Sequence, residues 1–283
     1  MNVITFQETI YNLWFLLHLF FTSMRDIFFY LILGALIGLL LGYKKLIASI
    51  QGNKSDTKKP FPMVWRQILS EKVNFYARLS RIDKNEFERK VHVFLLNVRI
   101  RGMETEVTEV DKILIAAGAI IPIFRFSKWN YANLEEVQLY PDKFLIPNTD
   151  KMANGLVGWG AMEGKMMLSR KAVHHGFYDN TDNKNVVIHE FVHILDKQDG
   201  KIDGILGKVM HELDIMPWLH VINIKMNEID FGNSSIRDYG ATNQAEFLAV
   251  VSEFFFENPE KLSDEHPKLY NALDSFYNQK KKF

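Results

Sequence analysis

The sequence predicts an α+β domain that follows an N-terminal transmembrane helix. Ile27 to Tyr43 is a run of 17 residues without a charge, which is just long enough to cross the hydrocarbon core of a bilayer. Gln51 to Pro62 is polar and charged and ends with two prolines, which is the composition of an exposed linker. The rest of the chain combines helical apolar spacing with a short strand pattern and a glycine-rich hairpin pattern. We therefore expect a membrane anchor over residues 1–50, a linker over 51–62 and a folded domain over 63–283.

The transmembrane helix is expected to be retained, because a removable signal peptide carries its basic residues before the apolar region. Here only Arg25 precedes the run closely, and the residues that follow it include Lys44, Lys45, Lys54, Lys58 and Lys59. The positive-inside rule then places the large domain in the cytoplasm, in a single-pass protein of the cell (inner) membrane. The shorter apolar stretch Leu13 to Met24 is expected at the interface or in a hairpin. In the alternative interpretation, both stretches are buried helices of a soluble domain.

Three glycines of the expected membrane helix share one face. Gly34, Gly38 and Gly42 recur every fourth residue, a spacing that lets two membrane helices approach closely. The pattern therefore suggests a homodimer, although glycine is common in membrane helices in general.

The overall composition excludes several classes of function. Lys plus Arg and Asp plus Glu both number 34, so there is no excess positive charge of the kind that binds nucleic acid. The chain has no cysteine, which excludes disulfides, thiol catalysis and thiolate metal sites. A metal site made of histidine and carboxylate side chains stays possible.

The folded domain is expected to begin with helices. Apolar spacing from Trp65 to Asn97 predicts two helices that are interrupted near Ser80 to Lys84. Asp111 to Ala119 is expected to form a buried helix, and Val137 to Tyr140 a short strand. The glycine-rich segment from Gly155 to Ser169 predicts a β-hairpin.

An apolar segment that starts at Val186 carries the sequence His189-Glu190-Phe191-Val192-His193. A helix brings residues four apart to the same face, so His189 and His193 could bind one metal ion, and zinc is the metal expected for this H-E-x-x-H pattern. Glu190 would then act as a base and not as a ligand. Burying two histidines in an apolar helix would cost folding free energy unless they bound a metal. The candidate N-caps of this helix are Asn180, Thr181 and Asp182.

A second apolar helix is expected from Asn243 to Phe256, and it contains two carboxylates. Glu246 and Glu253 are seven residues apart and share a face, so either could be the third ligand that a catalytic zinc requires. Asn243 followed three residues later by Glu246 is also a capping-box pattern. Spacing alone leaves these alternatives open.

These segments resemble the Mlc titration factor A family of zinc peptidases. The similarity covers most of Trp65 to Tyr277, and it is carried by HEFVHILDKQDGKIDG, YGATNQAE, FLAVVSEFFFENPE, DKILIAAGAIIPIF and EVQLYP. The resemblance implies a zincin-like fold of the gluzincin type, with one Zn²⁺ per chain bound by His189, His193 and Glu246. It also implies Glu190 as the general base and Tyr239 as an assisting residue, with Glu253 and Asp196 supporting the ligands from behind.

The resemblance implies the hydrolysis of peptide bonds in a peptide or protein substrate. Zinc lowers the pKa of its bound water toward about 7 and Glu190 accepts the proton, while zinc and Tyr239 stabilise the developing oxyanion. Tyr239 could instead be a core residue at the helix start. The founding family member is soluble and resembles a regulator that sequesters a transcriptional repressor. The rival hypothesis is therefore a membrane-tethered regulatory protein that sequesters a transcription factor or other partner, with catalysis secondary.

The stretch Gly160-Ala161-Met162-Glu163-Gly164 resembles the GAMEN segment of gluzincin aminopeptidases. This resemblance implies that Glu163 holds the free amino group of a substrate and that the enzyme is an aminopeptidase. Glu163 could otherwise be an exposed turn residue. The strand beside it could bind a peptide by pairing along its edge.

Overall fold

A computed structural model describes residues 60–126, 131, 133–158, 160–179 and 181–278, together with Ile32, Gly34 and Gly38. The chain divides into two units, Met1–Lys54 and Ser55–Phe283. The rest of the predicted membrane span, the preceding apolar stretch, Gly42 and residues 51–59 of the linker lie outside the described residues. Within the described residues, no helix combines the length and apolarity that crossing a membrane requires.

The domain begins with three helices, which are α2 (Met63–Lys72), α3 (Asn74–Ala77) and α4 (Arg81–Asn97). Two helices were expected here, but Val73, in an extended conformation, separates α2 from α3. The predicted interruption is present, but it ends at Ser80, whose side chain caps α4 by accepting from the backbone N–H of Asp83. Buried Glu88 of α4 accepts hydrogen bonds from Arg66 of α2 and Tyr76 of α3. This carboxylate therefore ties the three helices together.

The main sheet has four strands in the order β1 (Arg99–Gly102), β2 (Glu136–Tyr140), β6 (Lys165–Ser169) and β5 (Gly155–Val157). β1, β2 and β6 run parallel, whereas β5 is antiparallel to β6 and forms an edge. The strand predicted at Val137 and the hairpin predicted from Gly155 are therefore confirmed. The short strands β3 (Phe144–Leu145) and β4 (Met152–Ala153) form a separate hairpin.

The helix expected at Asp111 is α5 (Glu109–Ile123), and it is buried over most of its length. Thr108 and Asp111 form a capping box at its start. The fully buried Asp111 also binds α6 (Arg170–Tyr178), because Arg170 Nε and His174 Nε2 lie 3.0 and 2.6 Å from its Oδ1. The start of α5 is thereby fixed to the helix that follows β6.

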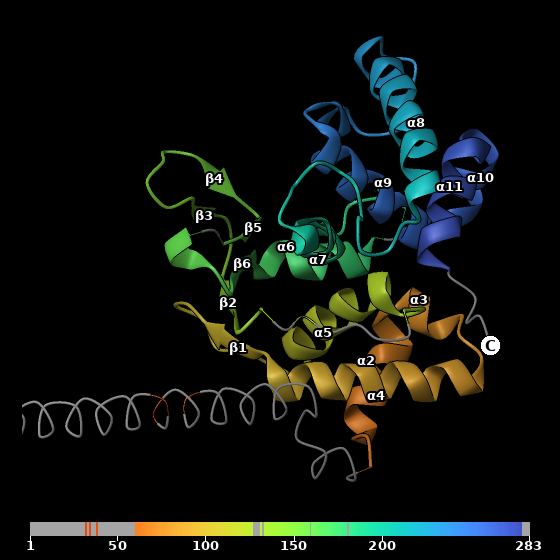
Figure 1. The fold of residues 1–283 in the computed structure, drawn as a ribbon. Helices are drawn as coiled ribbons and strands as arrows, with labels where there is room; N and C mark the ends of the chain where they lie inside the picture. The colour runs from red at the N-terminus through yellow and green to blue at the C-terminus, as the bar shows by residue number, and fades with distance from the viewer. Residues whose placement is uncertain are drawn as a thin grey trace, which may run out of the picture. The chain divides into compact units, whose positions relative to one another are not determined.

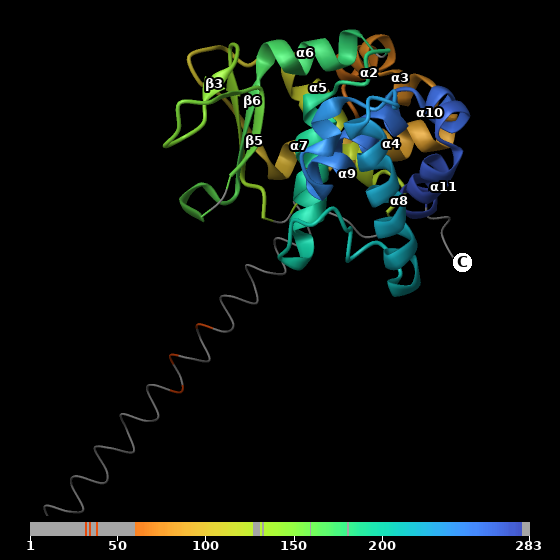
Figure 2. The same ribbon diagram turned by 90° about the horizontal axis from the view of Figure 1, so that it is seen from above.

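The remaining elements surround α7 (Val186–Asp196), which packs against α5, β5 and α9. Figure 2 shows the sheet on one side of α7 and α9 on the other. Asn185 caps α7 by accepting from the N–H of Ile188, so the caps predicted at residues 180–182 were placed too early. The later elements are η3 (Lys197–Asp199), α8 (Glu212–Asp230), η4 (Asp238–Ala241), α9 (Gln244–Glu257), α10 (Pro259–Glu265) and α11 (Pro267–Tyr277).

Helices and a small mixed sheet thus share one hydrophobic core, which runs from Ile68 to Tyr277, and the predicted α+β class is confirmed. The sheet lies beside the helical part (Figure 1). Two buried helices, α7 and α9, face each other next to the edge strand β5. This juxtaposition creates the candidate site.

Candidate metal centre

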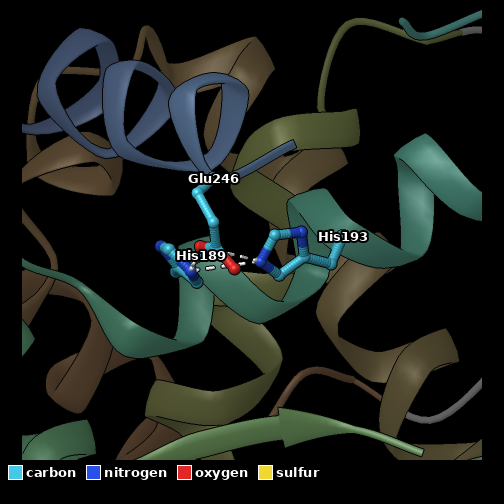
Figure 3. A group of neighbouring side chains, drawn as sticks. All are labelled: His189, His193 and Glu246. Carbon is cyan, nitrogen blue, oxygen red and sulfur yellow. Dashed lines mark hydrogen bonds and ion pairs between the residues drawn. The ribbon is translucent and has the colours of Figure 1, made fainter. Parts of the chain in front are cut away.

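Two histidines of α7 and one glutamate of α9 meet at a point (Figure 3). His189 Nε2 lies 3.1 Å from His193 Nε2 and 3.0 Å from Glu246 Oε2. The remaining separation, between His193 Nε2 and Glu246 Oε2, is 3.5 Å. Metal bonds of about 2.1 Å place tetrahedral ligand atoms roughly 3.4 Å apart. The two nitrogens and the oxygen therefore fit a single metal ion, since each of the three residues offers one ligand atom within 4.8 Å of the others.

The structure separates the two possible roles of Glu246. The capping contact is made by its backbone, whose N–H donates to Asn243 Oδ1 over 2.9 Å. Its carboxylate points instead to the histidines. Burial alone would raise the pKa of Glu246, but hydrogen bonds with His189 and His193 hold it well below its usual range. Glu246 could therefore offer a negative oxygen to a metal ion.

Glu253 lies on the opposite side of the His189 ring. Its Oε1 is 2.7 Å from His189 Nδ1, and it also accepts hydrogen bonds from the backbone N–H of Asn185 and from the guanidinium of Arg237. Burial would lower the pKa of His189, but the charge of Glu253 and the contact with Glu246 raise it to about 10. Glu253 therefore orients the ring through Nδ1 and leaves Nε2 to face Glu246 and His193.

Glu190 is buried next to the two histidines, with 6% of its surface exposed. Burial raises the pKa of Glu190, whereas the neighbouring His189 and His193 act to lower it. Its carboxylate packs against Gly155 of β5, where a Cβ atom would lie only 2.3 Å from Glu190 Oε1. A glycine at this position therefore lets the edge strand and the carboxylate lie in contact.

Tyr239 of η4 stands at the open side of the site. Its ring centre is 6.0 Å from that of His189, and 52% of its surface is exposed. Partial burial and the charges of Glu246 and Glu190 raise its pKa to about 12. The phenol thus keeps its proton at neutral pH and can donate a hydrogen bond to a bound molecule.

Asp196 is hydrogen-bonded to the loop that follows α7. Its two carboxylate oxygens each accept a backbone N–H at 3.1 Å, from Gly204 and from Ile205. Burial raises its pKa to about 6, although the bonds from both backbone groups oppose this. α7 ends at Asp196, so the hydrogen bonds of this carboxylate hold the following loop, while the nearby His193 acts on it through its charge.

Glu163 is placed differently from the prediction. It follows η2 (Gly160–Met162) in the turn between β5 and β6, its side chain is 60% exposed, and its carboxylate pairs with Lys197 Nζ at 3.4 Å. It lines a small pocket of about 290 Å³ together with Val157 and Ile194. The metal-binding group lies in a different and larger cleft, so Glu163 is a turn residue in this structure.

The larger cleft has a volume of about 1330 Å³ and contains His189, Glu190, His193, Tyr239 and Glu246. Pockets of about 300–1,000 Å³ hold drug-sized ligands, so this cleft has room for several residues of a peptide. Residues Gly155 to Val157 of β5 form part of its wall. The cleft therefore combines a group that could hold a metal ion, an adjacent buried carboxylate and a strand edge.

The sequence patterns did not identify Gly155 or Arg237 as part of the site. Gly155 looks like any hairpin glycine, and only its contact with Glu190 distinguishes it. Arg237 is two residues before Tyr239 in a loop without periodicity. An arginine near a buried Glu253 would have been a weak signal, because buried carboxylates need a partner.

Comparison with known proteins identifies relatives over most of the chain. A family model described as glucose-regulated metallo-peptidase M90 matches residues 48–278. An uncharacterized protein of Synechocystis sp. is 29% identical over 78% of this chain and 85% of its own length. Mlc titration factor A of Klebsiella pneumoniae is 29% identical over 77% of this chain and 86% of its own length. The same-named protein of Serratia proteamaculans is 31% identical over 71% and 83%, respectively.

Proposed function

The chain belongs to the glucose-regulated metallo-peptidase M90 family, and we propose that it is a zinc-dependent peptidase with a zincin-like fold of the gluzincin type. The family implies a metal ion, and the group formed by His189, His193 and Glu246 could hold it. The single observation that carries the proposal is the position of buried Glu190 beside this group. A structural metal has no use for a carboxylate that stands next to it without binding it.

Each residue of the cleft has a separate role in the proposed reaction. Zinc, when bound, supplies an acidic water and polarises the carbonyl of the scissile peptide. Glu190 takes a proton from the attacking water and passes it to the departing amine. Tyr239 donates a hydrogen bond to the carbonyl oxygen as negative charge develops on it. Glu253 keeps His189 in the required orientation, with Arg237 holding that carboxylate in turn.

The edge strand β5 is the proposed substrate-binding element. No other strand of the described residues pairs with its outer edge, so its backbone can pair with an extended peptide. Gly155 lies against Glu190, which brings a peptide on this edge next to the base. Glu163 is paired with Lys197 outside the cleft, so the arrangement favours cleavage within a chain over release of amino-terminal residues.

A peptide-library digest tests the proposed activity and its preference for internal bonds. The zinc-loaded chain should cleave peptides with free and acetylated amino termini at similar rates, because Glu163, the carboxylate predicted to hold the amine, is paired with Lys197 outside the cleft. Mass spectrometry of the products measures both rates, and a chelator should abolish them. If acetylation removed most of the cleavage, the enzyme would be an aminopeptidase and Glu163 would regain its predicted role.

Gly155→Ala should lower kcat/KM by about 10-fold or more while zinc content stays unchanged. The new methyl group would overlap Glu190 Oε1, and moving a catalytic group by about 1 Å is enough to cost about 10²-fold. Gly240→Ala is a suitable control, since a Cβ there meets its neighbours at an ordinary 3.5 Å. Wild-type activity in Gly155→Ala would show that the contact between β5 and Glu190 is not needed.

A regulatory binding protein is the second candidate function. Relatives are named Mlc titration factor A, which points to interaction with a protein partner. The exposed apolar side chains of α8 and the residue after it would suit such a partner, and they are Leu213, Met216, Ile224 and Phe231. A variant that cannot hydrolyse peptides distinguishes the two candidates. A regulatory binding protein would still sequester its partner in such a variant, whereas a peptidase would lose its effect.

The amino-terminal part is proposed to anchor the enzyme in the cell (inner) membrane, with the peptidase domain in the cytoplasm. The support is the uncharged run Ile27 to Tyr43 and the lysines that follow it. The full chain should sediment with membranes and require detergent for release, and a reporter fused after Phe283 should behave as cytoplasmic. A full chain that stays in the supernatant without detergent would contradict the anchor. The homodimer through Gly34, Gly38 and Gly42 remains a proposal of the same kind.

A further inference from the structure

One end of the cleft is basic. Beyond the metal site, its wall at this end carries one carboxylate, that of Asp142, and four lysine side chains: Lys143, Lys151, Lys171 and Lys184. Lys171 Nζ is 3.5 Å from Asp142 Oδ2, so one of the four charges is partly balanced. The other acidic residues of the wall are the three glutamates around the histidines and Asp203 in the loop after η3. The end next to β4 and α6 therefore has a net positive charge.

This basic end lies at the amino-terminal end of β5. The backbone N–H of Ser169 donates to the carbonyl of Asn154 over 2.7 Å, so the start of β5 adjoins the start of α6. β4 ends at Ala153, just before β5, and Lys184 immediately precedes Asn185, the N-cap of α7. Figure 1 shows β3, β4 and β5 close together. The lysines are thus grouped around one end of the proposed substrate-binding strand.

β5 and α7 run in the same direction along the cleft. Gly155 at the start of β5 lies against Glu190, and Val157 at its end shares the smaller pocket with Ile194, one turn further along α7. A peptide paired with β5 therefore has one part near the lysines and the other part near Val157. Antiparallel pairing is the more stable arrangement, and it directs the carboxyl-terminal part of the peptide toward the lysines.

We propose that this basic wall selects substrates with acidic residues on the carboxyl side of the cleaved bond. The inference rests on the proposed peptidase function for the cleavage itself, but the charge recognition is a separate property. All four lysines are exposed, so each contributes a modest, salt-sensitive attraction. Several like charges in one cleft act together and concentrate ligands of the opposite sign. A free carboxyl terminus bound at this end would add to the same effect.

The test uses the full, zinc-loaded chain and two sets of peptides that differ only after the cleaved bond. One set has three Asp or Glu residues there, and the other has three Asn or Gln residues. The ratio of kcat/KM for the acidic set to that for the neutral set should be about 10 at low salt. It should fall as ionic strength rises from 0.05 to 0.5 M, because the Debye length is only about 10 Å at 0.1 M.

The decisive variant replaces all four lysines of the wall with glutamine, and the ratio should then approach one. The matched control removes the same charge from lysines outside the cleft: Lys72, Lys112, Lys261 and Lys268. The control should keep the wild-type ratio. A wild-type ratio near one, or a ratio that survives in the variant without the four lysines, would overturn the proposal. Acidic residues favoured on the amino side of the cut would overturn the assigned direction.

A binding measurement separates this inference from the peptidase proposal. Fluorescence anisotropy of labelled acidic and neutral peptides should give Kd values that differ about 10-fold, and the difference should depend on the four lysines. If the chain hydrolysed neither set but bound the acidic peptides with this dependence, the peptidase function would fail and the recognition would stand. Equal Kd values for both sets would reject the recognition whatever the hydrolysis.

Discussion

Glu190→Gln is expected to keep its zinc and to lose hydrolysis by a factor on the order of 10² or more. The substitution removes the proton acceptor without changing any of the three ligand side chains. Glutamine has nearly the same size as glutamate, so its contact with Gly155 of β5 should persist. The measurement combines single-turnover cleavage of a library-derived peptide with zinc content determined on the same sample.

This result would support catalysis only if zinc content is unchanged, because a variant that loses metal would be inactive for another reason. His193→Ala provides that comparison, since it removes a ligand atom of the metal-binding group and should lose zinc and activity together. Asp196→Asn provides a comparison for the loop that follows α7, because it perturbs bonds to Gly204 and Ile205 and leaves the ligands in place. Full peptidase activity in Glu190→Gln would exclude Glu190 as the base.

Local periodicity explains why the sequence predicted the metal-binding pair. Residues four apart in a helix must share a face, and an apolar run with an Asn cap makes the helix itself predictable. The same reasoning placed Glu246 and Glu253 on one face of α9. They are seven residues apart, or about 10.5 Å along the helix axis, so they reach the two ring nitrogens of the same His189. Spacing within one helix could not decide which nitrogen each would meet.

Sequence reasoning was least informative about contacts that depend on distant parts of the chain. Asp196 is three residues after His193, but α7 ends there and the backbone N–H groups of Gly204 and Ile205 occupy its carboxylate. Glu163 was assigned from a local resemblance, whereas its place is set by the turn between β5 and β6 and by Lys197. The contact of Gly155 with Glu190 joins segments that are 35 residues apart. No periodic pattern in the sequence predicts such a contact.

The choice between Glu246 and Glu253 leads to a prediction about metal affinity. Glu246→Gln replaces one of the three proposed ligand atoms. If each ligand contributes about one third of a zinc-binding free energy of roughly 10–16 kcal/mol, the zinc affinity should fall on the order of 10³-fold. Glu253→Gln should weaken zinc binding only by about 10–100-fold, because Glu253 touches His189 Nδ1 and not the metal position. Competition with a chelator of known affinity measures both Kd values.

Glu257→Gln is the matched control for these two variants. Glu257 lies one turn beyond Glu253 on α9, and burial together with the charge of Glu253 raises its pKa to about 9, so it is uncharged at pH 7. Glutamine closely copies the shape of a protonated carboxyl group, and zinc affinity should therefore stay at the wild-type value. If Glu253→Gln lost more zinc than Glu246→Gln, the third ligand would be Glu253. The carboxylate of Glu246 would then serve only to orient the two histidines, and the distances of 3.0 and 3.5 Å to their Nε2 atoms would describe hydrogen-bonding contacts and not a ligand set.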